Sequence, residues 1–186
     1  MSYKTILVHV DESRHLTRRV EIAAGIAALH GAHLVGVAVT GVPDIFYDPM
    51  MFNLADPAIE PLLQERRKRA ADALSRFEAI ARKFPAVTVE ARLQENETAY
   101  GVSLQARYCD LAVLGQYDAG DLESSTRADF AETVILHAGV PVLMIPYTNE
   151  FAAPGQRALV AWNASKEAVR ALHYALRALE RAGQVG

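Results

Sequence analysis

The sequence predicts an α/β protein with a doubly wound, five-stranded parallel sheet, followed by the first β-α unit of a second copy. Short apolar runs rich in β-branched residues alternate with amphipathic helical patterns, as expected for strands covered on both faces. Strict alternation of strands and helices implies right-handed βαβ crossovers and therefore a parallel sheet. The pattern at the start of the chain then recurs near its end.

The composition limits the classes of partner. Of the 186 residues, 51% are hydrophobic and 22% are charged, which is typical of a globular chain. The formal net charge is −3, so no charge excess favours nucleic acid or an anionic membrane. The single cysteine, Cys109, cannot form an internal disulfide and favours a reducing cytoplasm. No apolar run approaches the roughly 18 residues of a membrane span.

The first part of the chain predicts two buried strands around one helix. Residues 5–10 predict the first strand, and Asp11 to Ser13 supply turn and N-cap chemistry. Apolar residues recur at helical spacing until Gly31 ends the helix, and residues 34–40 predict the second strand. Residues 41–57 contain three prolines and predict a long loop. Its apolar cluster at residues 47 and 50–52 is expected to fold back on its own domain, with a lid or a partner contact as the alternatives.

Three more strands are expected in the same domain. A long amphipathic helix runs from Ala58 until Pro85 ends it. Residues 87–93 alternate apolar and polar side chains, which predicts a half-exposed strand at a sheet edge. Further helices are expected at residues 98–108 and 128–137, and further buried strands at residues 110–115 and 140–146.

A partial repeat follows this domain. Residues 148–156 have linker composition and separate a first domain, residues 1–147, from residues 157–186. A shift of 152 positions aligns the following pairs: Asp11 with Asn163, Ser13 with Ser165, Ala23 with Ala175 and Gly31 with Gly183. One strand and one helix bury too little apolar surface to fold alone. We therefore expect the start of an incomplete second domain, or a unit that packs on the first domain or on a neighbouring chain.

Several ordered blocks of sequence carry a family resemblance. They are Ile6–Ser13 (ILVHVDES), Leu29–Val37 (LHGAHLVGV), Tyr108–Gly115 (YCDLAVLG), Gly139–Pro146 (GVPVLMIP) and, as a second opening, Leu159–Ala168 (LVAWNASKEA). In this order they resemble the universal stress proteins, specifically the tandem-domain members. The resemblance implies a Rossmann-like sheet of order 3-2-1-4-5, with two domains paired across their last strands as a homodimer or tandem pseudo-dimer. Catalysis is not the usual role of this family.

The resemblance also implies a candidate nucleotide site. Many members bind ATP through an aspartate after the first strand, a valine that ends the second, and a G-x2-G-x9-G-[S/T] loop after the fourth. These positions map onto Asp11, Val39 and Gly115. Ligands of open α/β sheets bind at the carboxyl ends of the strands, at the topological switch point. The alternative for Asp11 is a polar residue at a strand end that helps Ser13 cap the next helix.

Beyond Gly115 the loop departs from the family pattern. The second glycine position holds Asp118, the third holds Ala128 and the hydroxyl position holds Asp129. Residues 116–132 carry five acidic residues against one base, Arg127. A carboxylate about 6 Å from a phosphate oxygen costs roughly 2–3 kcal/mol.

Two further features bear on this loop. The stretch Thr126–Asp129 fits a helix-capping pattern, which would place a carboxylate where a phosphate would lie. A magnesium ion held by the aspartates would offset the repulsion.

The remaining polar clusters favour structural interpretations. His30 and His33 straddle Gly31 and do not share a helical face, so no metal site is expected. The run Glu65–Arg69 favours a solvated helix face over a nucleic-acid site. Cys109 is expected to be an inert core residue.

The sequence thus predicts a cytoplasmic, non-enzymatic binding and interaction module of the stress response, whose first domain carries a degenerate nucleotide loop. The alternative is an ATP-binding nucleotide switch that uses Asp11, Val39 and Gly115. An enzyme on the same sheet is a third hypothesis, and the sequence contains no G-x-G-x-x-G after a strand, no G-x-S-x-G and no P-loop lysine motif to support it.

Overall fold

The computed structural model describes residues 2–42, 59–121, 124, 126–148 and 155–186. The chain divides into Tyr3–Tyr147 and a second compact unit that contains Thr148–Gly186. The apolar cluster predicted at residues 47 and 50–52 lies outside the described residues, as does most of the predicted loop 41–57.

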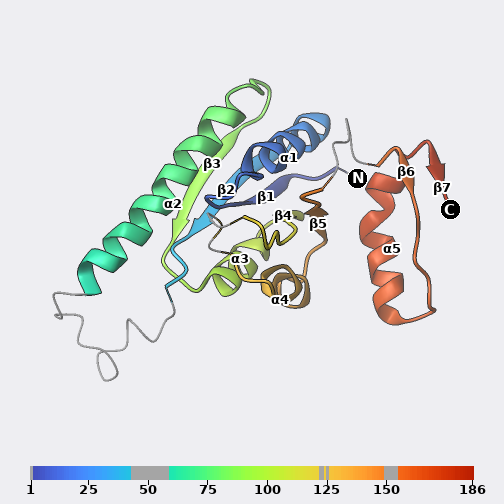
Figure 1. Cartoon of the computed structure of the whole chain (residues 1–186). Helices are drawn as coiled ribbons and strands as arrows, with labels where there is room; N and C mark the ends of the chain where they lie inside the picture. The colour runs from blue at the N-terminus through green and yellow to red at the C-terminus, as the bar shows by residue number, and fades with distance from the viewer. Residues whose placement is uncertain (1, 43–58, 122–123, 125, 149–154) are drawn as a thin grey trace. The chain divides into compact units, whose positions relative to one another are not determined.

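Parallel strands form the sheet of the first unit, in the order β3-β2-β1-β4-β5 (Figure 1). The strands are β1 (Thr5–Val10), β2 (His33–Val39), β3 (Val89–Gln94), β4 (Leu111–Gly115) and β5 (Val142–Ile145). Ile6 in β1 pairs with Leu34 on one side and with Leu111 on the other. The expected parallel sheet and its strand order are confirmed, and the alternating strand β3 lies at an edge as predicted.

Helices cover both faces of this sheet (Figure 1). The helices α1 (Leu16–His30) and α2 (Ile59–Ala81) pack together over one face, and α3 (Thr98–Ala106) and α4 (Phe130–His137) pack together over the other. α1 ends at Gly31 as predicted, because this residue adopts the left-handed conformation with φ 62°. Within the described part of the chain, no helix is long and apolar enough to cross a membrane.

The long helix α2 ends before the predicted position. The pattern of apolar residues placed the end of α2 at Pro85, whereas the helix ends at Ala81. The amides of Lys83 and Phe84 donate to the carbonyls three residues earlier, at 3.1 and 2.9 Å. The chain therefore tightens into turns before the proline is reached.

A close contact between helix and strand fixes one side of the core. Phe77 of α2 is fully buried and lies over Gly36 in the middle of β2. A Cβ atom on Gly36 would overlap the Phe77 ring, so glycine is required for this close approach. On the opposite face, the buried cluster beneath α3 and α4 contains Leu7, Val35, Val37, Val102, Leu114, Phe130 and Val134.

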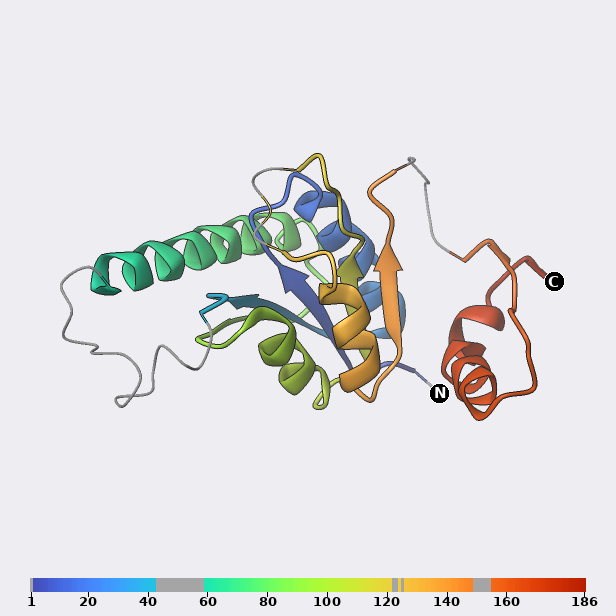
Figure 2. The ribbon, with the colours of Figure 1, turned by 60° about the horizontal axis from the view of Figure 1, so that its bottom comes forward.

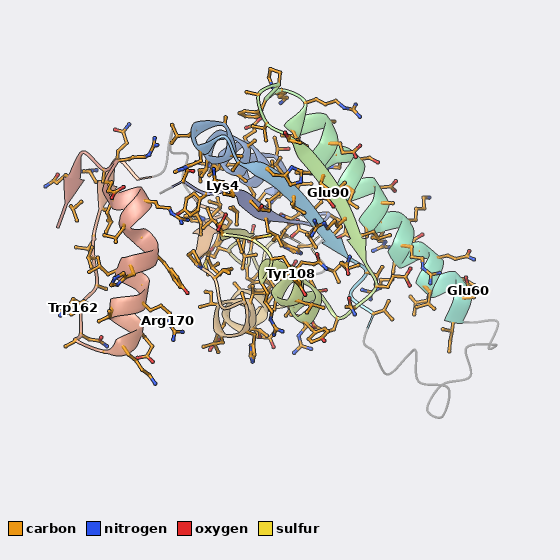
Figure 3. The ribbon with its side chains drawn as sticks, turned by 180° about the vertical axis from the view of Figure 1, so that it is seen from behind. Lys4, Glu60, Glu90, Tyr108, Trp162 and Arg170 are labelled. Carbon is orange, nitrogen blue, oxygen red and sulfur yellow. The ribbon has the colours of Figure 1, made fainter. Side chains whose placement is uncertain are left out.

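The C-terminal unit contains a second parallel strand pair. β6 (Arg157–Ala158) pairs with β7 (Gln184–Val185), and α5 (Lys166–Leu179) connects them. No side chain of α5 is buried. Trp162, labelled in Figure 3, is 56% exposed. This β-α-β arrangement matches that of β1, α1 and β2.

Candidate functional site

Two strand ends create a polar site in the first unit. Asp11 follows β1 and Gly115 ends β4, and the loops that leave these strands lie side by side (Figure 2). Both residues line a cavity of about 20 Å³. A cavity of this size holds about one water molecule. This cavity by itself therefore has room for a water molecule and not for a nucleotide.

The structure brings together two of the three predicted site residues. Asp11 and Gly115 line the cavity, whereas Val39 is not among its lining residues in the described chain. Val39 ends β2 and packs partly buried against the core cluster. A Cβ atom on Gly101 of α3 would lie 3.0 Å from the Val39 side chain, so α3 covers this valine.

The carboxylate of Asp11 is buried and occupied by donors of this chain. It accepts hydrogen bonds from Nη2 of Arg19 at 2.5 Å, from the Ser13 amide at 3.2 Å and from the Thr126 hydroxyl at 3.3 Å. Burial acts to raise the pKa of Asp11, but Arg19, His9 and the hydrogen bonds outweigh it, so the pKa is lowered. The carboxylate is therefore charged and paired at neutral pH.

The sequence analysis did not identify Arg19, the arginine that pairs with Asp11. Arg19 lies on the buried face of α1 between Leu16 and Val20, and only 3% of its side chain is exposed. Its Nε donates to the carbonyl of His9 at 2.8 Å. A charged residue at an apolar helix position was the available signal, since such a residue is buried only when paired. Removing one partner of a buried ion pair costs about 3–5 kcal/mol.

His9 completes the buried polar group. Its Nδ1 lies 3.8 Å from Oδ2 of Asp11, and its ring packs on Phe130 of α4 with centroids 4.5 Å apart. Burial lowers the pKa of His9 to about 4, with the nearby Asp11 raising it and Arg19 lowering it. His9 is therefore neutral at neutral pH.

A second ionic cluster ties the two loops together. Asp118 accepts hydrogen bonds from Nη2 of Arg14 at 2.6 Å and from the Gly120 amide at 2.9 Å, and its Oδ2 lies 2.9 Å from Nε2 of His15. Asp121 accepts from the Arg14 amide at 3.1 Å. The His15 and Arg14 hydrogen bonds hold the pKa of Asp118 well below its usual range. Side chains of the β1–α1 loop thus pair with Asp118, and these residues lie outside the stretch 116–132.

The predicted capping pattern at the next helix is wrong. Asp129 precedes α4, and within the described residues its side chain makes no capping hydrogen bond. Its carboxylate instead pairs with Arg127, with both contacts at 3.1 Å. The Thr126 hydroxyl donates to Asp11 rather than to the helix. The helix start therefore carries an exposed ion pair because Arg127 competes for the carboxylate.

His33 and Cys109, which the sequence analysis assigned no binding role, have structural surroundings that agree with that assignment. Nε2 of His33 lies 3.1 Å from Glu90, which is labelled in Figure 3 on the edge strand. The Arg92 and His33 hydrogen bonds lower the pKa of Glu90 to about 2. Cys109 is buried, and burial raises the pKa of its thiol to about 11, which matches the predicted inert residue.

These features define the class of the protein. A parallel α/β sheet with polar groups gathered at the carboxyl ends of its central strands is a Rossmann-like domain with a site at the topological switch point. The profile of the Universal stress protein family matches residues 2–146, and the chain belongs to this family.

One relative in sequence and two solved structures are similar to this chain. A universal stress protein encoded in the QAH/OAS sulfhydrylase 3′ region of Thermus aquaticus is 29% identical over 147 residues, which are 77% of this chain and 98% of that protein. The UspA structure from Lactobacillus plantarum superposes with a TM-score of 0.64 at 24% identity, over 78% of this chain and 99% of that one. The universal stress protein of Archaeoglobus fulgidus solved in complex with dAMP has a TM-score of 0.53 at 23% identity, over 77% and 98%.

Proposed function

We propose that this chain is a non-enzymatic binding and interaction module of the stress response, and that its first domain does not hold ATP. The observation that carries the proposal is the pairing of Asp118 with Arg14 and His15. In the G-x2-G-x9-G-[S/T] loop of the family, the position of Asp118 is a glycine, which leaves room for phosphate groups to approach the backbone. Here a carboxylate closes the loop onto the β1–α1 loop. The lone buried Cys109 supports a cytoplasmic setting.

Direct measurement of bound nucleotide tests this proposal. We expect purified wild-type protein to release no adenine nucleotide on denaturation and to give no saturable heat with ATP and magnesium in calorimetry. The triple variant Asp118→Gly, Ala128→Gly, Asp129→Ser restores the glycine pattern of the family loop and is the matched control for these side chains, so any ATP affinity that it gains is assigned to their removal. Stoichiometric ATP in the wild-type protein would overturn the proposal.

The alternative function is an ATP-binding nucleotide switch at Asp11, Val39 and Gly115. The similarity to a protein solved in complex with dAMP supports binding of an adenine nucleotide. Two observations oppose the switch. Arg19 donates a hydrogen bond to the Asp11 carboxylate, and Val39 is not among the described lining residues of the cavity. The same calorimetry with AMP and dAMP decides between the two functions.

We also propose that residues 157–186 begin a second domain of the tandem type. Asn163 Oδ1 accepts from the Ser165 amide at 3.0 Å, as Asp11 Oδ1 accepts from the Ser13 amide at 3.2 Å. A chimaera in which residues 157–183 replace residues 5–31 tests this equivalence. We expect the chimaera to fold cooperatively. The control is a chimaera that carries a scrambled sequence in place of residues 157–183. If neither chimaera folds, the equivalence is contradicted.

Assembly through the last strand is the final part of the proposal. Within the described residues β5 pairs only with β4, and Met144 on this strand is 38% exposed. Leu136 of α4 is 71% exposed. We propose that this edge pairs in a homodimer or tandem pseudo-dimer. Light scattering should show a dimer that Met144→Lys weakens, and a monomeric wild-type protein would contradict the homodimer.

A further inference from the structure

The guanidinium of Arg19 fills the crevice between the ends of β1 and β4. Nε donates to the His9 carbonyl at 2.8 Å and Nη2 donates to Asp11 at 2.5 Å, so one planar group satisfies two acceptors at the end of β1. Its Nη1 lies so close to Gly115 that a Cβ atom there would overlap it. The arginine therefore contacts both strands that form the switch point.

We propose that Arg19 is an internal ligand that determines the specificity of this site. A carboxylate and a carbonyl oxygen side by side select a planar group with N–H donors. Arg19 supplies that group from within the chain and leaves a cavity of only about 20 Å³. The first domain is closed by its own side chain, and without Arg19 the same acceptors bind an external planar N–H donor such as an alkylguanidinium. This inference rests on the proposed function only in taking the wild-type site as closed.

The internal repeat supports this role independently. The shift of 152 positions places the α1 residues Leu16, Val20, Ala23 and Ala27 on apolar residues of α5, namely Ala168, Leu172, Ala175 and Leu179. The same shift places Arg19 on Ala171 and Asp11 on Asn163. The arginine and its carboxylate are thus both replaced, and by neutral residues. An amide needs no counter-charge, so the two positions behave as one unit.

Chemical rescue tests the proposal. The variant Arg19→Ala removes the guanidinium and leaves the acceptors in place, and n-propylguanidinium chloride is the probe. We expect saturable binding to Arg19→Ala with a dissociation constant on the order of 1 mM, together with a rise in melting temperature. Wild-type protein should show neither effect, and n-propylammonium chloride controls for ionic strength.

The double variant Arg19→Ala, Asp11→Asn reproduces the pair found at Asn163 and Ala171. It leaves no charge unpaired, so we expect it to fold cooperatively and to bind the probe at least about tenfold more weakly, as expected when a charged acceptor is lost. If Arg19→Ala alone does not fold, recovery of the folded state when the probe is present during refolding supports the proposal.

Two results would overturn it. One is an Arg19→Ala protein that responds to the probe no more than wild type does. The other is an unfolded Arg19→Ala protein that the probe does not rescue although the double variant folds. Binding of ATP to wild-type protein would instead overturn the proposed function. The binding of n-propylguanidinium to Arg19→Ala would still test the role of Arg19.

Discussion

Gly115 and Arg19 are in direct contact at the end of β4, where the absence of a side chain on the glycine makes room for the guanidinium of the arginine. Arg19 is held in place by Asp11 and by the carbonyl of His9, so it cannot move aside freely. The glycine that the family resemblance assigns to a nucleotide loop thus serves an internal contact in this chain.

This contact predicts the effect of adding one methyl group. Gly115→Ala should lower the free energy of unfolding by about 1–3 kcal/mol, because the methyl group overpacks a buried and pinned side chain. Urea denaturation measures the change. Gly25→Ala is the matched control, since Gly25 is exposed in α1 and a Cβ atom there would meet nothing within 4 Å. The control should raise stability by about 0.5–1 kcal/mol.

The buried His9 predicts loss of stability at acidic pH. Its pKa is about 4 in the folded protein against 6.5 for the free side chain. The unfolded chain therefore binds the proton first as the pH falls, and the free energy of unfolding decreases from about pH 6.5 down to about pH 4. The expected loss is about 3 kcal/mol.

Urea denaturation across this pH range measures the effect. His9→Phe keeps an aromatic ring against Phe130 and cannot titrate, so over the same window it should lose about 3 kcal/mol less stability than the wild-type protein. An equal loss in this variant would assign the pH dependence to other groups.

The hydrogen bonds that Asp118 accepts from Arg14 and from the Gly120 amide predict a local change in dynamics. Asp118→Asn weakens the acceptor that holds the Gly120 amide and the Arg14 side chain. Hydrogen exchange at the Gly120 amide should accelerate on the order of tenfold, as expected for the loss of one charge-assisted hydrogen bond. Asp129→Asn, which alters only an exposed pair with Arg127, should leave this amide unchanged. An unchanged exchange rate in Asp118→Asn would mean that the hydrogen bonds of Asp118 do not order the loop that follows β4.

The core contact between α2 and β2 predicts a large loss of stability. Phe77→Ala removes a fully buried ring above Gly36 and leaves a cavity, so we expect a cost of about 3–5 kcal/mol. Tyr108→Ala is the control, because Tyr108 is 75% exposed and should change stability by less than about 0.5 kcal/mol. Thermal and urea denaturation measure both variants.

The order of elements was predictable because each depends on local signals. The β-branched run at residues 5–10 and the helix stop at Gly31 agree with β1 and the end of α1. The end of α2 was not predictable from Pro85, because the backbone changes to hydrogen bonds three residues apart at Lys83 and Phe84, before the proline. The candidate site was predicted in part: Asp11 and Gly115 line the cavity, while Val39 packs under α3.

The sequence by itself determined the alternation of strands and helices, the parallel sheet and the positions where strand ends would present polar residues. Periodicity along the chain carries that information. Only the tertiary structure decided that Arg19 pairs with Asp11 and that Arg14 and His15 contact the Asp118 carboxylate. These partners are separated along the chain by 8, 104 and 103 positions. Whether a carboxylate repels a phosphate or is already paired depends on which bases the fold brings within hydrogen-bonding distance, and spacing in sequence does not encode that.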